Sequence, residues 1–321
     1  MDTYLLIFGI LIICSIVYLK TAKKYNIIDR PNERSSHTEV TIRGGGILFP
    51  LSILFFFFLH NFQYPYFIIA VFLIAIVSFL DDIYTLPSKI RFPIQFLAMV
   101  LVLVEVGLSV TLWYVYFPIL IVGLAVINFF NFMDGINGIT GFNGLACLLG
   151  VFFINQNELL INPDLLIFLV LSILVFGYYN FRKKALFFAG DIGSITLGLS
   201  IVFFTTLLYD KLQAPLVWLL VMCFGSDGTL TLLYRKIYTN ESVFEPHRHH
   251  IYQKLVHQKK WSHLKVSFVY GLLQAGCSLF VYFTYQLPFS LQWTILFIWS
   301  TVIGVSYILV FRWIASSSIQ Y

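Results

Sequence analysis

The sequence carries little charge. Asp, Glu, Lys and Arg together make up 11% of its 321 residues, whereas hydrophobic residues make up 59%, and the mean hydropathy is +0.87. This composition excludes an ordinary soluble domain and is typical of a polytopic membrane protein. The formal net charge of +5 does not indicate a nucleic-acid partner, because the basic residues follow the pattern of membrane topology instead.

Two further features are scarce or absent. The four cysteines all lie inside apolar runs and form no CxxC pair, which excludes a disulfide framework and a cysteine-ligated metal centre. The chain begins Met-Asp, and its first apolar run has no basic lead and no Ala-x-Ala cleavage site. We therefore expect that run to be a retained first span, not a removed signal peptide.

Long apolar runs fill most of the chain and predict an all-α membrane protein with about eleven transmembrane helices. We find no internal repeat and no separate soluble domain, so residues 1–321 form one integral membrane domain. The predicted helices cover about 4–19, 44–60, 66–80, 92–108, 110–128, 139–154, 164–181, 192–209, 214–234, 265–285 and 292–311.

The basic residues predict the orientation of these helices. Nineteen of the twenty Lys and Arg residues fall on the same side of the predicted topology, and only Lys211 falls on the other. Because basic residues concentrate in cytoplasmic loops, this side is expected to be cytoplasmic and the N-terminus outside. The polar motifs described next fall on the same side, so we expect the functional site to face the cytoplasm.

Four oxygen-bearing side chains recur every three residues between two apolar runs: Asn128, Asn131, Asp134 and Asn137. If the segment were helical they would drift slowly around one side of the helix. Three glycines follow the same spacing in its second half, which favours a tight turn there. Carboxylate and amide oxygens suit a hard cation such as Mg²⁺.

Two adjacent acids, Asp81 and Asp82, end the third predicted span. They could be interfacial capping charges, because a helix end is the least costly membrane position for an acid. However, paired acids repel each other and need a cation or a shared proton, which favours a functional role. Lys89 and Arg91 follow after one short loop and could bind a substrate phosphate.

Two more acids lie in or beside apolar runs. Asp191 begins the eighth predicted span within Gly-Asp-Ile-Gly-Ser, and it could be a helix N-cap or, together with the other acids, a metal ligand. Asp227 interrupts the ninth run well before its end. An intramembrane acid is a functional-site hypothesis by default, unless the helix breaks at that point.

Basic and glycine-rich segments complete the motifs. A loop near the C-terminus holds His247, Arg248, His249 and His250. It favours a phosphate or diphosphate clamp over zinc, although a solvated basic loop attracted to anionic lipid stays open. Near the N-terminus, Thr41 and Arg43 precede three glycines that allow close approach to a ligand or a neighbouring helix.

Acids for a divalent cation, with bases for phosphate oxygens around them, are the recurring groups of phosphoryl transfer. A membrane-embedded site that opens to the cytoplasm implies one lipid substrate and one soluble substrate. Two other classes stay open. A secondary transporter should carry motifs on both faces and near the mid-bilayer, and an intramembrane aspartyl protease would need facing acids, for which Asp191 and Asp227 are the candidate pair.

The ordered motifs resemble the polyprenyl-phosphate N-acetylhexosamine-1-phosphate transferase superfamily over nearly the whole chain. The resemblance depends on the Asp81-Asp82 pair with Lys89, on the segment from Asn128 to Asn137, on Gly190-Asp191-x-Gly-Ser, and on the His-rich loop. That loop lacks the acid-ended form of the peptidoglycan branch, so it looks more like the branch that begins O-antigen, capsule or exopolysaccharide repeats.

The resemblance implies transfer of a sugar 1-phosphate from a UDP-N-acetylhexosamine to undecaprenyl phosphate in a bacterial inner membrane, with release of UMP. It leaves the sugar open among GlcNAc, GalNAc, QuiNAc and FucNAc. It implies Mg²⁺, with Mn²⁺ as an alternative, no nucleic acid, the lipid bilayer as surroundings, and it allows for a homo-oligomer.

By the same resemblance, Asn131 and Asp191 would bind the metal, and Asp81, Asp82 and Lys89 would be catalytic. Asp81 or Asp82 would position or deprotonate the lipid phosphate, and His247, Arg248 and His250 would hold the sugar-diphosphate end. Asn137 would contact the uracil. The other expected substrate-binding residues are Asn128, Asp134, Thr41, Arg43 and His249.

Overall fold

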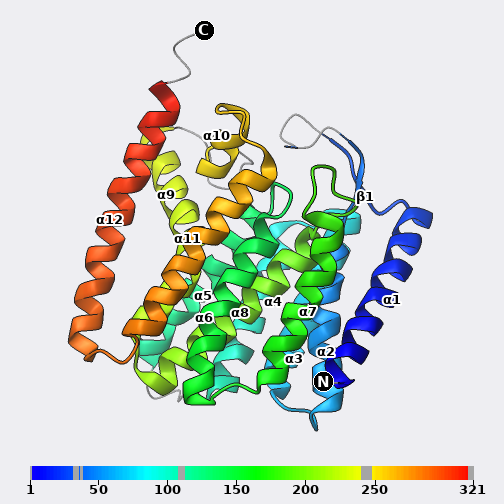
Figure 1. The fold of residues 1–321 in the computed structure, drawn as a ribbon, viewed down its shortest axis with the longest axis horizontal. Helices are drawn as coiled ribbons and strands as arrows, with labels where there is room; N and C mark the ends of the chain where they lie inside the picture. Colours follow the sequence, from blue (N-terminus) through cyan, green and yellow to red (C-terminus); the bar gives the residue numbers. More distant parts are fainter. Residues whose placement is uncertain (1, 32–35, 37–38, 108–112, 240–247, 317–321) are drawn as a thin grey trace.

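The computed structural model describes residues 2–31, 36, 39–107, 113–239 and 248–316, and these ranges form a bundle of helices (Figure 1). The α-helices are α1 (Asp2–Lys24), α2 (Leu48–Leu59), α3 (Pro65–Tyr84), α4 (Ser88–Val106), α5 (Trp113–Met133), α6 (Ile139–Glu158), α7 (Pro163–Asn180), α8 (Gly190–Leu212), α9 (Met222–Tyr238), α10 (Ile251–His257), α11 (His263–Thr284) and α12 (Phe289–Ser316). Two 3₁₀ helices, η1 (Gly45–Ile47) and η3 (Pro215–Val221), precede α2 and α9.

Every apolar run that predicted a span coincides with a helical segment, so the all-α polytopic membrane fold is confirmed. Among the described residues, nine helical segments are long and apolar enough to cross a membrane, with η3 and α9 counted together. The other two predicted spans are α2, which has only 12 residues, and α4, which contains Lys89, Arg91 and Glu105. The count of eleven crossings therefore stays a prediction.

Helix α8 lies at the centre of the bundle. Within its most apolar stretch, 94% of the residues are buried inside the protein, compared with 28% for α1 and 6% for α12. A helix that is apolar on all sides is expected to occupy such a position. Phe203 of α8 stacks on Phe67 of α3 with 4.2 Å between ring centroids, while α1 and α12 occupy opposite edges of the bundle (Figure 1).

A short hairpin positions the start of α8. Strands β1 (Ile28–Asp29) and β2 (Thr41–Ile42) pair antiparallel, and the chain then enters η1 against α8. A Cβ atom added to Gly46 would lie 2.2 Å from the Cα of Gly193, so the two backbones touch where neither residue has a side chain. The predicted close approach of these glycines to a neighbouring helix is confirmed.

The ninth apolar run contains a change of helix type, but not at Asp227. The 3₁₀ helix η3 ends at Val221, whose φ of −119° and ψ of 16° are not helical, and α9 begins at Met222. Asp227 lies inside α9 and is 3% exposed. The alternative that the helix breaks at Asp227 is therefore wrong, and the acid is a buried group within a regular helix.

The polar motifs gather at one end of the bundle. The hairpin and α10 lie at the end of the bundle where α12 ends, opposite to the start of α1 (Figure 1). The last turn of α3 and the end of α5 contact the start of α8, which follows the loop that bonds to the hairpin. Backbone bonds link the hairpin and η1 to the loop before α8, because the amide of Gly45 donates to the carbonyl of Phe188 (2.8 Å) and the amide of Phe188 donates to the carbonyl of Ile42 (2.8 Å). This end therefore holds the candidate site.

Candidate active site

The pair of acids at the end of α3 connects directly to the start of α8. The carboxylate of Asp82 accepts the backbone N–H groups of Asp191 (2.9 Å) and Ile192 (3.2 Å). Gly190, with φ of +70°, makes this approach possible, because a Cβ there would lie 2.5 Å from Asp82 Oδ2. Asp82 thus caps α8 from another helix, and the alternative that Asp191 is the N-cap is wrong, because Ala189 occupies that position and Asp191 lies inside the first turn.

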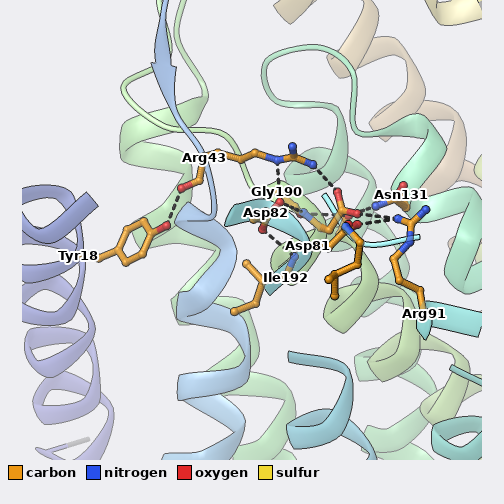
Figure 2. A network of polar contacts seen from close by, with 11 residues as sticks. Tyr18, Arg43, Asp81, Asp82, Arg91, Asn131, Gly190 and Ile192 are labelled. Atoms are coloured by element: carbon orange, nitrogen blue, oxygen red, sulfur yellow. Dashed lines mark hydrogen bonds and ion pairs between the residues drawn. The ribbon is translucent and has the colours of Figure 1, made fainter. Parts of the chain in front are cut away.

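Two arginines bind the three carboxylates of this cluster (Figure 2). Arg43 places Nε 2.6 Å from Asp82 Oδ1 and Nη2 2.8 Å from Asp191 Oδ1. Arg91 places Nη1 2.7 Å from Asp81 Oδ2 and 3.2 Å from Asp191 Oδ2. Asp191 is therefore the shared centre, and the neighbouring acids of α3 each pair with a different guanidinium. We call these five residues the acid–arginine cluster.

The charge of the acid–arginine cluster is unbalanced. Three carboxylates face two guanidinium groups, so ionised acids leave an excess of negative charge in a largely buried place. Burial lowers the pKa of Arg43, but the charges of Asp191 and Asp82 raise it by more, so that it lies above its ordinary value. The guanidinium therefore stays positively charged. Such a site attracts a cation and, through its arginines, can also bind phosphate oxygens.

Of the four evenly spaced side chains, only Asn131 lies beside the acid–arginine cluster (Figure 2). Its Nδ2 donates to the hydroxyl of Ser194 at 3.4 Å, one turn into α8. The residues expected to bind metal, Asn131 and Asp191, are thus brought together. Asn128 lies elsewhere, because its Nδ2 donates to Gln95 Oε1 of α4 at 2.9 Å and links two helices.

The second half of this segment is the predicted tight turn. Helix α5 ends at Met133 and Gly138 has a φ of +89°. The hydroxyl of Thr140 donates to Asp134 at 2.5 Å. Burial raises the pKa of Asp134 to about 7, although the Thr140 bond opposes that shift. Asn137 donates through Nδ2 to the carbonyls of Arg182 (2.9 Å) and Lys183 (3.2 Å).

A polar cavity of about 120 Å³ opens beside this turn. Its lining combines groups from the hairpin, the α5–α6 turn, the loop before α8 and α10, and it includes Asp29, Asp134, Asn137, Phe188 and Gln253. Carboxylate, amide and aromatic groups together are suited to a polar planar ligand. Asp134 and Asn137, which the sequence predicts to bind substrate, therefore line the same cavity.

Two predicted residues lie away from the acid–arginine cluster. Lys89, in the first turn of α4, is exposed and forms no ion pair with any residue in the described ranges. Its neighbour Arg91 supplies the basic group that reaches the acids. Thr41 is buried in β2, and its hydroxyl donates to the carbonyl of Glu39 at 3.2 Å.

The His-rich loop contributes to a second polar group. His247 lies outside the described residues, while Arg248 and His249 are partly buried beyond the end of α9. His250 is 3% exposed, and its Nδ1 lies 3.3 Å from Asp227 Oδ1. Asp191 and Asp227 thus have separate sets of partners, which is not the arrangement of an aspartyl protease dyad.

Several residues of the site have no obvious signal in the sequence. The hydroxyl of Tyr18 in α1 donates to the carbonyl of Arg43 at 2.5 Å. Asn180, at the end of α7, accepts the amide of Gly138 at 2.7 Å and donates to the carbonyl of Phe187 at 3.0 Å. The sequence gives one weak signal for Tyr18 and Asn180: each is a polar residue near the end of a predicted span, on the side of the membrane where the polar motifs also fall.

Comparison with known proteins finds one family model and several transferases that are similar to this chain. Residues 64–209 match the model of glycosyl transferase family 4, and this range includes the acid pair, the α5–α6 turn and Asp191. A probable undecaprenyl-phosphate N-acetylglucosaminyl 1-phosphate transferase of Bacillus subtilis (strain 168) is 26% identical over 273 residues, which are 77% of this chain and 74% of that protein.

Two relatives from other bacteria carry the same kind of name. An undecaprenyl-phosphate alpha-N-acetylglucosaminyl 1-phosphate transferase of Escherichia coli (strain K12) is 24% identical and covers 74% of this chain and 71% of its own length. The Salmonella typhi protein of that name is 26% identical and covers 73% of this chain and 70% of its own length. The chain is therefore similar to glycosyl transferase family 4 over residues 64–209, and to undecaprenyl-phosphate N-acetylglucosaminyl 1-phosphate transferases over 73–77% of its length.

Proposed function

We propose that this protein transfers an N-acetylhexosamine 1-phosphate from a UDP-sugar to undecaprenyl phosphate and releases UMP. The observation that carries the proposal is the acid–arginine cluster, in which Asp81, Asp82 and Asp191 meet Arg43 and Arg91 at one end of a membrane bundle. The names of the relatives support the lipid acceptor and the sugar 1-phosphate donor.

In the proposed reaction, an oxygen of the lipid phosphate attacks the β-phosphorus of the UDP-sugar. The bond from that phosphorus to the bridging oxygen breaks, and UMP leaves with the bridging oxygen. The second pKa of a phosphate monoester is about 6, so the attacking group is already mostly ionised at neutral pH. The chain's task is then to position two anions and to balance their charge, not to remove a proton.

Arg43 and Arg91 are suited to this task. Each guanidinium is held by two carboxylates, so its position is fixed before a substrate arrives. A fixed guanidinium can donate to phosphate oxygens without a large loss of side-chain freedom. We propose that these arginines bind phosphate oxygens, and that Asp81 and Asp82 hold the two guanidinium groups in the orientation that this requires.

The donor set also fits Mg²⁺, with Mn²⁺ as an alternative. Among the described residues, no three His, Cys, Asp or Glu side chains are arranged to hold a metal ion. However, Mg²⁺ is usually bound by one or two carboxylates together with water and substrate phosphates, and Asp191 with Asn131 supplies such a partial set. When bound there, the ion would neutralise charge on the diphosphate.

The cavity beside the α5–α6 turn is the proposed place of the nucleotide base. Asn137 uses its Nδ2 group on two backbone carbonyls, so its carbonyl oxygen is the part of the amide that could accept the N3–H group of uracil. Phe188 adds an aromatic surface and Asp134 a polar one. We propose that Arg248 and His249 contribute to the sugar-diphosphate end.

The proposed setting is a bacterial inner membrane, with the site on the cytoplasmic face and the N-terminus outside. The distribution of the basic residues supports this orientation. The product would be a lipid-linked sugar that begins an O-antigen, a capsule or another cell-envelope polysaccharide.

The decisive test is UMP release by the detergent-purified protein. It would be given undecaprenyl phosphate, Mg²⁺ and, in turn, the UDP derivatives of GlcNAc, GalNAc, QuiNAc and FucNAc. UMP that requires both the lipid and the metal, and that disappears with EDTA, supports the proposal and names the sugar. No UMP from any donor, together with no binding of UDP-sugars or UMP, would reject it.

A further inference from the structure

Asp227 of α9 is the centre of a buried polar group that lies apart from the acid–arginine cluster. Its Oδ1 accepts the backbone N–H of Ile251 at 3.1 Å and the hydroxyl of Thr231 at 3.0 Å, and it lies 3.3 Å from His250 Nδ1. Its Oδ2 accepts the hydroxyl of Tyr270 at 2.7 Å. One carboxylate thus joins α9, α11 and the start of α10.

These contacts are suited to fixing a position. A buried carboxylate is costly unless hydrogen bonds satisfy it, and both oxygens of Asp227 are occupied by groups of the protein itself. The bond to Ile251 also places a negative charge at the N-terminus of α10, where helix amides favour one. Asp227 therefore has the surroundings of a structural anchor, not of a group that meets a substrate.

Helix α10 in turn contacts the turn between α5 and α6. The hydroxyl of Tyr252 donates to the backbone carbonyl of Phe132 at 3.0 Å. A Cβ added to Gly135 would lie 2.3 Å from that hydroxyl, so the tyrosine is pressed against the turn. The ring of His250 stacks on Tyr252 with 5.7 Å between centroids, which connects the anchor to this contact.

We infer that Asp227 is a positioning residue, which fixes His250 and the start of α10 so that Tyr252 supports the turn carrying Asp134 and Asn137. This inference deepens the proposed function and rests on it. It also gives His250 a different role from the one the sequence predicts. The ring orients the loop through its Nδ1 contact with Asp227, and is not a ligand of the sugar diphosphate.

Substitutions of His250 separate these two roles. The amide nitrogen of an asparagine takes nearly the place of a histidine Nδ1, so His250→Asn keeps a donor toward Asp227, whereas His250→Ala removes it. If positioning is the role, His250→Asn retains a UMP-release rate within about threefold of the native protein. His250→Ala and Asp227→Asn should each lose about tenfold to a hundredfold, as is usual for groups that orient a functional side chain.

A double variant tests whether the two residues act as one unit. Asp227→Asn combined with His250→Ala should be no slower than His250→Ala alone, because residues of one unit lose their effect together. The matched control is Gln274→Met. Gln274 is a fully buried amide that links the backbone at Cys223 to α11 without reaching α10, so its loss should lower thermal stability but leave the rate within about threefold.

Hydrogen exchange gives a readout that needs no substrate. In detergent, Asp227→Asn should speed amide exchange in α10 and around Phe132 to Ile136 relative to the native protein and to Gln274→Met. If Asp227→Asn does not fold, Tyr270→Phe removes a single bond to the same carboxylate and should give a smaller change at the same amides.

Three results would overturn the inference. These are a native rate and native exchange in Asp227→Asn, a His250→Asn variant as slow as His250→Ala, or rate losses that multiply in the double variant. If the native protein releases no UMP from any UDP-sugar, the proposed function fails. The exchange measurement then decides by itself whether Asp227 holds α10 on the turn.

Discussion

The carboxylate of Asp82, at the end of α3, accepts the backbone N–H of Asp191, at the start of α8, over 2.9 Å. Each of these acids also contacts Arg43. Asp82 therefore combines two tasks, since it caps the central helix of the bundle and belongs to the charged cluster. Its neighbour Asp81 pairs with Arg91 instead and contacts no part of α8 through a backbone bond.

Asp82→Asn should destabilise the protein more than Asp81→Asn. The amide keeps one acceptor for the N–H groups of Asp191 and Ile192 but turns a donor toward the other, and a buried group left without its partner costs about 1–3 kcal/mol. Thermal unfolding of the two detergent-purified variants measures the difference. Equal midpoints would contradict the capping role of Asp82.

Activity of the same variants should fall by a factor that does not change with pH. If the acids position the lipid phosphate and do not deprotonate it, the ratio of native to variant rates stays constant between about pH 6.5 and 8.5, above the second phosphate pKa of about 6. A general base would give a loss that shrinks as pH rises, because hydroxide and ionised substrate replace the base. Steady-state UMP release at several pH values distinguishes the two.

Arg43→Lys should not preserve function. Arg43 reaches two different acids with two different nitrogens, Nε and Nη2, and one ammonium group cannot reproduce that geometry. Hydrogen bonds to charged groups contribute about 1.5–3 kcal/mol each, so we expect a fall of about tenfold or more in kcat/KM. Arg91→Lys is the comparison, because Arg91 uses a single nitrogen for both of its contacts and should lose less.

The sequence was sufficient to predict the long helices, although not the short helix α10, and to predict that the polar motifs gather at one end of the bundle. Apolar runs and loop charges depend on the surrounding membrane more than on tertiary contacts, so a short stretch of sequence is enough to predict a span. The tight turn after Met133 was also predictable, because its glycines have few other uses in such a segment. The association of Asn131 with Asp191 came from motifs and a family resemblance.

The hydrogen-bond partner of each polar side chain was not predictable in the same way. Asn128 belongs to the same regular spacing as Asn131, yet it bonds to Gln95 of α4, and only the packing of α4 on α5 decides this. Asp82 instead of Asp191 caps α8, because a carboxylate from another helix reaches the free amides. Tyr18 and Tyr252 contribute backbone contacts that no spacing in the sequence indicates.

Gly46→Ala should disturb the site from a position outside the charged cluster. The added Cβ would lie 2.2 Å from the Cα of Gly193, so η1 and α8 must move apart, and overpacking of this kind costs about 1–3 kcal/mol. Because Arg43 enters the site from the adjoining hairpin, activity should fall as well. Gly276→Ala is the control, since nothing lies within 4 Å of its added Cβ. A native midpoint and rate in Gly46→Ala would exclude the tight contact.

Asp191→Asn should weaken Mg²⁺ binding more than any other single change in the cluster. Asp191 is the carboxylate that both arginines share, and its amide analogue retains one neutral oxygen for Mg²⁺ in place of a charged group. We expect the Mg²⁺ concentration for half-maximal UMP release to rise by about tenfold or more, by analogy with the loss of one charge-assisted contact of about 1.5–3 kcal/mol.

The matched control for this metal titration is Asn128→Leu, because Asn128 bonds to Gln95 of α4. Although the sequence places Asn128 among the substrate-binding residues, its bond in the structure lies between helices, so its loss should leave the Mg²⁺ requirement unchanged. Titration of Mg²⁺ after EDTA treatment measures both variants under the same conditions. An unchanged Mg²⁺ requirement in Asp191→Asn would remove Asp191 from the proposed metal site, and a raised requirement in Asn128→Leu would add Asn128 to it.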